Sequence, residues 1–172
     1  MSTQPTFLVE VARALVAEVA QNTEDVLEAA RQLTEKSWRG TFAAIGIVGR
    51  LESDLTLAMK LCDTAANADP NVALEDGTTP VVVKAMVLFQ RGLIAMGQKR
   101  FKDAVKCFEL SLSYSPDQAT YFNTALCFLR MKGIFTDRTP DAIAAFQKCI
   151  EIDPKMETAI DAGKELARLG RL

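Results

Sequence analysis

The sequence predicts an all-α protein built from repeated antiparallel helical hairpins. Apolar residues recur with the 3.6-residue period of a helix, and strand-like alternation does not persist anywhere in the chain. A second pattern recurs at a fixed interval: an alanine, then an aromatic residue or cysteine four positions later, then a proline eight positions beyond that. Its three copies are Ala58–Cys62–Pro70, Ala104–Phe108–Pro116 and Ala142–Phe146–Pro154. A fixed internal interval of this kind is typical of repeat architectures.

The bulk composition is that of one packed domain with no strong charge preference. The 172 residues are 49% hydrophobic and carry a net charge of −2, so we expect neither nucleic acid nor an anionic membrane as the main partner. No stretch reaches the ~20 uninterrupted apolar residues that a bilayer requires, so we expect no membrane insertion. No basic residue precedes Arg13, and the start of the chain therefore lacks the charged region of a signal peptide. We expect a cytoplasmic protein, and leave open that a transit peptide has been removed.

Residue types that support catalysis or metal binding are scarce. Cys62, Cys107, Cys127 and Cys149 form no C-x-x-C pair and fall within helical apolar patterns, so we expect reduced structural thiols. Histidine, the commonest general base and metal ligand, is absent from the sequence. No G-x-x-x-x-G-K-[ST] loop is present. The sequence therefore predicts no cofactor, no metal site and no enzyme activity.

Taken in order along the chain, cap and breaker residues predict about nine helices. Residues 7–37 are expected to form a pair of helices, the second beginning near residue 24, directly after Thr23. Ser53-Asp54 is expected to open a further helix. Thr79-Pro80 and Thr139-Pro140 each combine an N-cap hydroxyl with a proline at the first helical position, where its missing N–H and fixed φ cost nothing.

Small residues precede each copy of the recurring pattern at a matching interval. Gly46 and Gly92 lie twelve residues before the alanines of the first two copies. Ala125 lies 17 residues before the alanine of the third copy, which matches if five residues are inserted within Lys132–Asp141. We therefore expect each unit to be a helix, a turn and a second helix, with the small residue where the two helices approach closely.

These residues resemble the tetratricopeptide repeat, a helical hairpin of about 34 residues with the pattern W-x2-L-G-x2-Y…A-x3-F…P. The segment Phe89–Pro116 matches this pattern well, and the segment Tyr121–Pro154 follows it. The copy Trp38–Pro70 is weaker, because Cys62 stands where the family has an aromatic residue. The spacing between copies exceeds the family's period, and the excess falls into two loops, Asn71–Thr79 and Lys132–Asp141.

The resemblance implies a right-handed superhelix of antiparallel helical hairpins, with the whole chain forming a single domain. About three repeats are expected, preceded by an N-terminal helix pair that is either separate or a degenerate repeat. The expected units are the N-terminal pair 7–37, the repeats 38–72, 85–117 and 118–155, and a capping helix 156–169.

In this family the first helices of successive repeats line a concave groove, so the resemblance implies a binding site for a protein or peptide partner. Helical spacing supports the mapping, since Met86, Phe89 and Leu93 stand at i, i+3 and i+7. The set is apolar with a sparse polar rim. Any single member is better explained as core, but the set as a whole then needs something to cover it. The expected groove residues are Ile47, Arg50, Leu51, Met86, Phe89, Gln90, Leu93, Met96, Phe122, Asn123, Leu126, Leu129 and Arg130.

Two arrangements of this groove stay open from the sequence alone. The groove either faces a partner or is filled by the N-terminal helix, whose apolar stripe comprises Phe7, Leu8, Val11, Leu15 and Val19. One subset of the family grips the acidic C-termini of heat-shock chaperones with lysine, asparagine and arginine at set positions. Only Asn123 of that set has a plausible counterpart here, so we do not expect this activity.

The leading functional hypothesis is an adaptor that binds an apolar helix or an extended peptide in the groove. Phe89, Leu93, Phe122 and Leu126 are the expected apolar anchors. One alternative is a chaperone or assembly factor for a hydrophobic client, similar in size and repeat count to the type III secretion translocator chaperones. Another is a structural subunit of a larger complex, which self-associates through the N-terminal helix.

Overall fold

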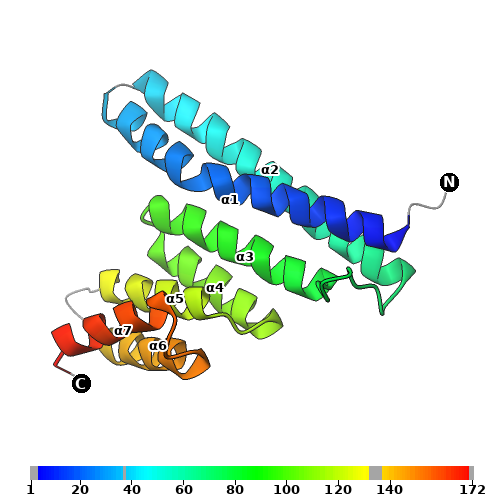
Figure 1. The fold of residues 1–172 in the computed structure, drawn as a ribbon. Coiled ribbons are helices and arrows are strands. Elements are labelled where there is room, and N and C mark those ends of the chain that lie inside the picture. Colours follow the sequence, from blue (N-terminus) through cyan, green and yellow to red (C-terminus); the bar gives the residue numbers. More distant parts are fainter. Residues whose placement is uncertain (1–3, 37, 132–136, 171–172) are drawn as a thin grey trace.

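The computed structural model describes residues 4–36, 38–131 and 137–170, and these residues form seven α-helices and no strand. The prediction of an all-α fold is therefore confirmed. Figure 1 shows the helices in chain order. They are α1 (Pro5–Lys36), α2 (Trp38–Ala68), α3 (Pro80–Gly97), α4 (Phe101–Tyr114), α5 (Gln118–Arg130), α6 (Thr139–Ile152) and α7 (Glu157–Arg168).

The helices form a stack of antiparallel hairpins. Helices α1 and α2, α3 and α4, and α5 and α6 pair with each other, and α7 packs on α6 and α5 (Figure 1). Each first helix of a hairpin also contacts the first helix of the next, α1 with α3, α3 with α5, and α5 with α7. The first helices therefore follow one another along one side of the stack, which is the arrangement expected of a helical repeat. Helix α7 lies where the capping helix was expected.

The recurring sequence pattern occupies the same place in each hairpin, on its second helix. The alanine and the following cysteine or phenylalanine are fully buried in α2, α4 and α6 alike. Each of these helices ends two residues before its proline, at Ala68, Tyr114 and Ile152. Because proline cannot continue a helix and restrains the residue before it, the prolines account for these three ends. The pattern is thus the core face and the stop signal of the second helix.

The N-terminal segment is one long helix, so the expected helix pair at 7–37 is wrong. Thr23 does not cap a new helix: its side chain is buried inside α1, and its hydroxyl donates a hydrogen bond to the Val19 carbonyl at 2.7 Å. A threonine that bonds back to residue i−4 is compatible with a continuous helix. The buried stripe Val9, Ala12, Val16, Val19 runs directly into Thr23, so packing carries the helix through this position.

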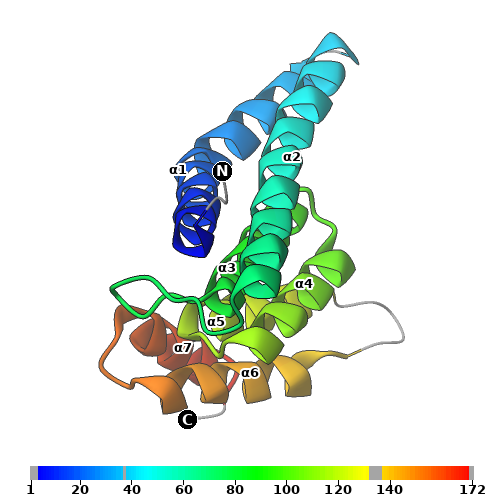
Figure 2. The same ribbon diagram turned by 90° about the vertical axis from the view of Figure 1, so that its right-hand side faces the viewer.

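The segment expected to be the first repeat, 38–72, also departs from the prediction, because residues 38–68 form the single helix α2. Ser53 and Asp54 lie inside this helix, and Gly46 is exposed on it with nothing within 4 Å of a Cβ built there. Gly46 therefore cannot mark an opposing helix. The partner helix of α2 is α1, so the first unit of the stack is the long hairpin α1–α2. Its far end projects beyond the other helices (Figure 2).

The two expected Thr-Pro helix starts have different outcomes. Thr79 caps α3 as expected, since its hydroxyl accepts a hydrogen bond from the Val82 N–H at 3.4 Å. Thr139 is instead the first residue of α6, and its N–H donates to the Asp137 carboxylate at 2.9 Å. Of the two expected loops, residues 71–79 connect α2 to α3 and bury Val72. Residues 132–136 of the other loop lie outside the described residues.

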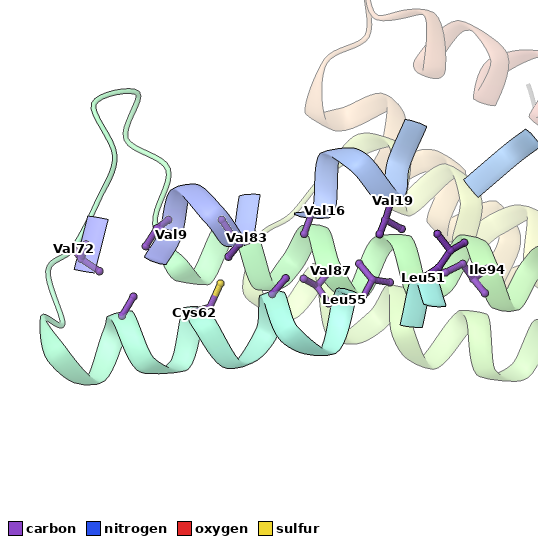
Figure 3. Close-up of a cluster of buried hydrophobic side chains, with 13 residues drawn as sticks. Val9, Val16, Val19, Leu51, Leu55, Cys62, Val72, Val83, Val87 and Ile94 are labelled. Atoms are coloured by element: carbon purple, nitrogen blue, oxygen red, sulfur yellow. The ribbon is translucent and has the colours of Figure 1, made fainter. Parts of the chain in front are cut away.

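The core has two parts, one under each end of the stack. The N-terminal part joins α1, α2 and α3, and Figure 3 shows Val16 and Val19 of α1 facing α3 residues that include Val87 and Ile94. Two ion pairs join α2 to α3 at the surface, Lys84 with Asp63, and Arg91 with Glu52 at 3.1 Å. A third, Arg13 with Asp76, joins α1 to the loop between α2 and α3. The C-terminal part is formed by residues of all five helices from α3 through α7. Helix α3 belongs to both parts and is the centre of the fold.

Candidate functional site

The apolar residues predicted on α3 and α5 lie together on adjacent helices. All are partly exposed, and most of them also pack against the C-terminal core. Helices α3 and α5 contact each other directly, so these residues lie on neighbouring helices of one surface of the stack. We call this surface the α3–α5 face. Its residues are Met86, Phe89, Leu93, Met96, Phe122, Leu126 and Leu129.

The two phenylalanines of this face are held by the recurring aromatic residues of the second helices. The Phe89 ring lies 5.8 Å from that of Phe108 in a tilted arrangement, and the Phe122 ring lies 5.6 Å from that of Phe146 in an edge-on arrangement. Both geometries are favourable for aromatic pairs. Phe108 and Phe146 are fully buried, so each hairpin fixes one ring of the face from below. The face is therefore built in advance of any binding partner.

Helix α1 does not cover the α3–α5 face in the part of the chain that the structure describes. Its contacts are with α2 and α3 and do not reach α5. The expected stripe packs only in part: Leu8 and Leu15 are partly buried against the N-terminal core, whereas Phe7 is 54% exposed. Of that stripe only Val19 belongs to the buried core. The arrangement in which the N-terminal helix fills the groove is therefore not the one observed.

Ile47, Arg50 and Leu51 are not brought to the α3–α5 face. They lie on α2, the second helix of its hairpin, and line a cavity of about 360 Å³ against Glu18 and Val19 of α1. Sequence reasoning grouped them with α3 because Gly46 suggested a first helix there. Their role in binding a partner stays a prediction, but it would be a site separate from the α3–α5 face.

The polar residues of the predicted set have distinct surroundings. Asn123 donates a hydrogen bond from its amide to the Ala119 carbonyl of its own helix at 2.8 Å. Arg130 is exposed at the end of α5. Gln90 is only 8% exposed, and its Oε1 has no hydrogen-bond partner among the described residues. An unpaired buried amide oxygen is costly in a folded protein, so Gln90 is unusual among these three.

Gln90 lines a cavity of about 330 Å³ at one end of the α3–α5 face, between α3, α4 and the start of α5. We call it the α3–α4–α5 cavity. Sequence reasoning identified Met86, Phe89 and Gln90 but missed the residues contributed by the other two helices. The only local signal was Asp117, an N-cap residue placed directly after Pro116. The cavity is lined by Val82, Ala85, Met86, Phe89, Gln90, Ser111, Ser115, Asp117, Ala119 and Thr120.

Comparison with known families agrees with this architecture. Models of the tetratricopeptide repeat match residues 85–118, which cover most of α3 and all of α4, and residues 136–156, which contain α6. The chain carries tetratricopeptide repeats. The matched segments include the buried pairs Ala104–Phe108 and Ala142–Phe146. A comparison with curated proteins finds no match, and neither does one with solved structures.

Tetratricopeptide repeats are protein-interaction modules. The α3–α5 face lies on the first helices of the two hairpins that the family models match in part. Helix α3 is also the one described helix that is long and apolar enough to cross a membrane, by length and composition alone. Half of it is buried against its neighbours, as expected for the core helix of a packed stack. The absence of membrane insertion stays a prediction.

Proposed function

We propose that this protein is an adaptor that binds an apolar helix, or an extended apolar segment, of a partner protein on the α3–α5 face. The observation that carries the proposal is a preformed, partly exposed apolar surface on the first helices of tetratricopeptide hairpins. Phe89 and Phe122 are the anchors, because the rings of Phe108 and Phe146 support them from below. Leu93 and Leu126 continue the surface along the two helices.

The charges of α3 and α5 support an apolar partner rather than a charged one. Helix α3 carries only Lys84 and Arg91, and both form ion pairs with α2. Helix α5 carries only Arg130, at its last residue. A partner segment on this face therefore meets apolar side chains with little charge to desolvate. Full burial of one large apolar side chain contributes about 1.5–3 kcal/mol, and these half-buried residues contribute less than that each.

The experiment is a selection of displayed peptides on the immobilised chain, followed by affinity measurements on the selected sequences. A double variant, Phe89→Glu with Leu126→Glu, removes the face, and Met86→Glu is a milder change at a residue that is 37% exposed. Leu110→Glu is the matched control, because Leu110 is 49% exposed on α4, outside the face. Circular dichroism establishes that each variant keeps its helices.

We expect the selected peptides to be apolar. Their affinity should fall at least tenfold for the Met86→Glu protein, be lost for the double variant and stay unchanged for Leu110→Glu. Peptides that bind all variants equally would place recognition elsewhere on the protein. Failure to enrich any peptide on the folded chain would count against an adaptor of this kind. If the double variant unfolds, Met86→Glu alone decides the question.

A chaperone for an apolar client is the second candidate, favoured by the same low charge of the face. The two functions differ in what the protein does to its ligand. A chaperone suppresses aggregation of the selected peptide when the peptide is held above its solubility, and Met86→Glu removes that effect. An adaptor binds the peptide without changing its solubility limit.

Self-association through α1 also remains a proposal. Phe7 is 54% exposed near the start of α1, on a helix whose opposite side is buried against α2 and α3. Light scattering over a concentration series tests it. A monomer at all concentrations, or a dimer that Phe7→Glu does not dissociate, would exclude this surface.

A further inference from the structure

The α3–α4–α5 cavity differs from the rest of the α3–α5 face because its lining is partly polar. Gln90 is more than nine-tenths buried there, and its Oε1 lacks a partner. Met86 and Phe89 belong to both the cavity and the apolar face, so a segment bound on the face passes the mouth of the cavity. We infer that this cavity is a subsite for a basic side chain, a lysine or an arginine, of the partner segment. This inference rests on the proposed function of the face.

Two hydroxyls of the cavity have only acceptor capacity left. The Ser111 hydroxyl donates to the Ala85 carbonyl at 2.7 Å, and the Thr120 hydroxyl donates to the Asp117 carboxylate at 2.8 Å. Each hydroxyl has one proton, so both have only lone pairs left to offer. Gln90 adds its unpaired Oε1. A ligand group that satisfies these atoms must be a hydrogen-bond donor.

The electrostatics of the cavity favour a positive charge. Among the residues that the structure describes, Asp117 is the one charged residue of its lining. Helix α4 ends beside it at Tyr114 and has no basic residue in its last turn, so its negative dipole end is uncompensated by its own side chains. The positive end of α5 also lies here, but its Thr120 N–H already donates to the Asp117 carboxylate at 2.8 Å. A cation is therefore attracted by a carboxylate and by a helix C-terminus.

The shape of the lining suits a long basic side chain better than a small cation. Val82, Met86 and Phe89 provide an apolar wall, and the acceptors come from Gln90 and the start of α5. Lysine and arginine place a methylene stem on apolar surface while their charged end reaches polar groups. Three ammonium protons or five guanidinium N–H groups can then bond to the acceptors. A glutamate or aspartate of the partner would be repelled by the Asp117 carboxylate.

The test is a titration of the full-length, isotope-labelled chain with capped amino acids, followed by backbone amide shifts in NMR spectra. The probe is N-acetyl-lysine N-methylamide, and N-acetyl-norleucine N-methylamide is its uncharged match. We expect shifts that cluster at Met86, Gln90 and Thr120 for the lysine probe, with at least threefold weaker binding of norleucine. Equal binding of both probes, or shifts that cluster away from the cavity, would overturn the assignment.

Two variants separate the cavity from a general effect of charge. Asp117→Asn removes the carboxylate but keeps a good N-cap, and Gln90→Leu removes the unpaired oxygen at similar volume. Each is expected to weaken the lysine probe at least threefold, and Gln90→Leu is expected to raise the melting temperature of the free chain as well. Asp103→Asn on α4 is the control, since it removes an equal charge outside the cavity.

The outcome for the cavity is separable from that for the face. Selected peptides measure the apolar face, and the capped lysine measures the cavity without any peptide. The subsite would be refuted if the selected peptides lacked an enriched basic residue and the protein did not prefer the lysine probe. The proposal of an adaptor would then still stand. The subsite would also be refuted if Asp103→Asn weakened binding of the lysine probe as much as Asp117→Asn does.

Discussion

A Cβ atom built on Gly92 would lie 2.2 Å from Cε1 of Phe108, far inside van der Waals contact. Gly92 is on α3 and Phe108 on α4, so the two helices of this hairpin approach so closely that a ring packs against bare backbone. The ring has little room to move, because Phe108 is fully buried and also contacts Phe89. This contact sets the distance between α3 and α4, and through Phe89 it supports the α3–α5 face.

Gly92→Ala should therefore destabilise the protein, although alanine is the better helix former. The added methyl group must displace Phe108, at a typical overpacking cost of about 1–3 kcal/mol. The gain in helix propensity is about 1 kcal/mol, so the net change is a loss. Urea denaturation followed by circular dichroism measures the difference.

Two other glycines provide a graded control for this prediction. A Cβ on Gly97 would lie 2.5 Å from the flexible end of Leu27, which can rotate away, and a Cβ on Gly163 meets nothing within 4 Å. We expect Gly97→Ala to be near neutral and Gly163→Ala in α7 to stabilise by about 0.5–1 kcal/mol. If Gly92→Ala were as stable as Gly163→Ala, the close approach of α3 and α4 would be refuted.

Gln118 is expected to be the most sensitive polar residue of the last hairpin. Its buried amide donates from Nε2 to the Cys149 and Asp153 carbonyls, both at 2.8 Å, and so ties the start of α5 to the end of α6. Gln118→Leu leaves both carbonyls without this donor, at a cost of about 1–3 kcal/mol. Thermal unfolding measures the loss, and faster hydrogen exchange near the end of α6 would locate it. Gln147→Leu, at an exposed position of α6, should have no measurable effect.

The sequence pattern predicted the core face and the end of each second helix correctly, because local chemistry determines both. Alanine and an aromatic residue at i and i+4 share one helix face, and a proline sets the end of the helix. The same holds for Thr79 and Pro80 at the start of α3. None of these features depends on distant parts of the chain, so they can be read directly from neighbouring residues.

The prediction was wrong where packing over a long distance outweighs a local signal. Thr23 has the residue type of an N-cap, yet the continuous apolar stripe of α1 keeps the helix intact and its hydroxyl bonds back to Val19. The α3–α4–α5 cavity was missed for the same reason. Gln90 and Asp117 are separated in sequence by a whole helix, and only the stacking of three helices brings them to one cavity.

The cysteines should differ in reactivity according to their burial. Burial raises the pKa of Cys62 and of Cys127 to about 11, so both remain protonated thiols near neutral pH, where the thiolate is the reactive form. Cys107 also has a raised pKa but is only half-buried. Under native conditions we expect a thiol reagent to modify Cys107 first. Labelling followed by mass spectrometry measures the order, and Cys107→Ser should remove the fast phase, which no other cysteine should then replace.

The ion pair between Lys84 and Asp63 should stabilise the α2–α3 contact from neutral to moderately alkaline pH. The hydrogen bond from Lys84 to Asp63 raises the pKa of the lysine above its ordinary value of 10.5. A raised lysine pKa means that the stabilisation is fully present below the unfolded pKa and disappears as pH rises through the folded one. Asp63 is 55% exposed, so the screened pair is worth less than about 1 kcal/mol.

Asp63→Asn is therefore expected to lower the free energy of unfolding at neutral pH, and its difference from the parent protein should disappear as the pH rises through the raised pKa of Lys84. Denaturant titrations over this pH range measure the difference between the two proteins. Cys127 and Cys149 ionise in the same range, but they lie away from the pair and cancel in the difference. Asp63 also helps to raise the pKa of Cys62, so both proteins are compared in a Cys62→Ala background. Glu151→Gln, which breaks the fully exposed pair with Lys148, is the control and should show a smaller difference at every pH. A gap between Asp63→Asn and its parent that persists above the lysine pKa would show that packing of α2 on α3, and not the ion pair, was lost.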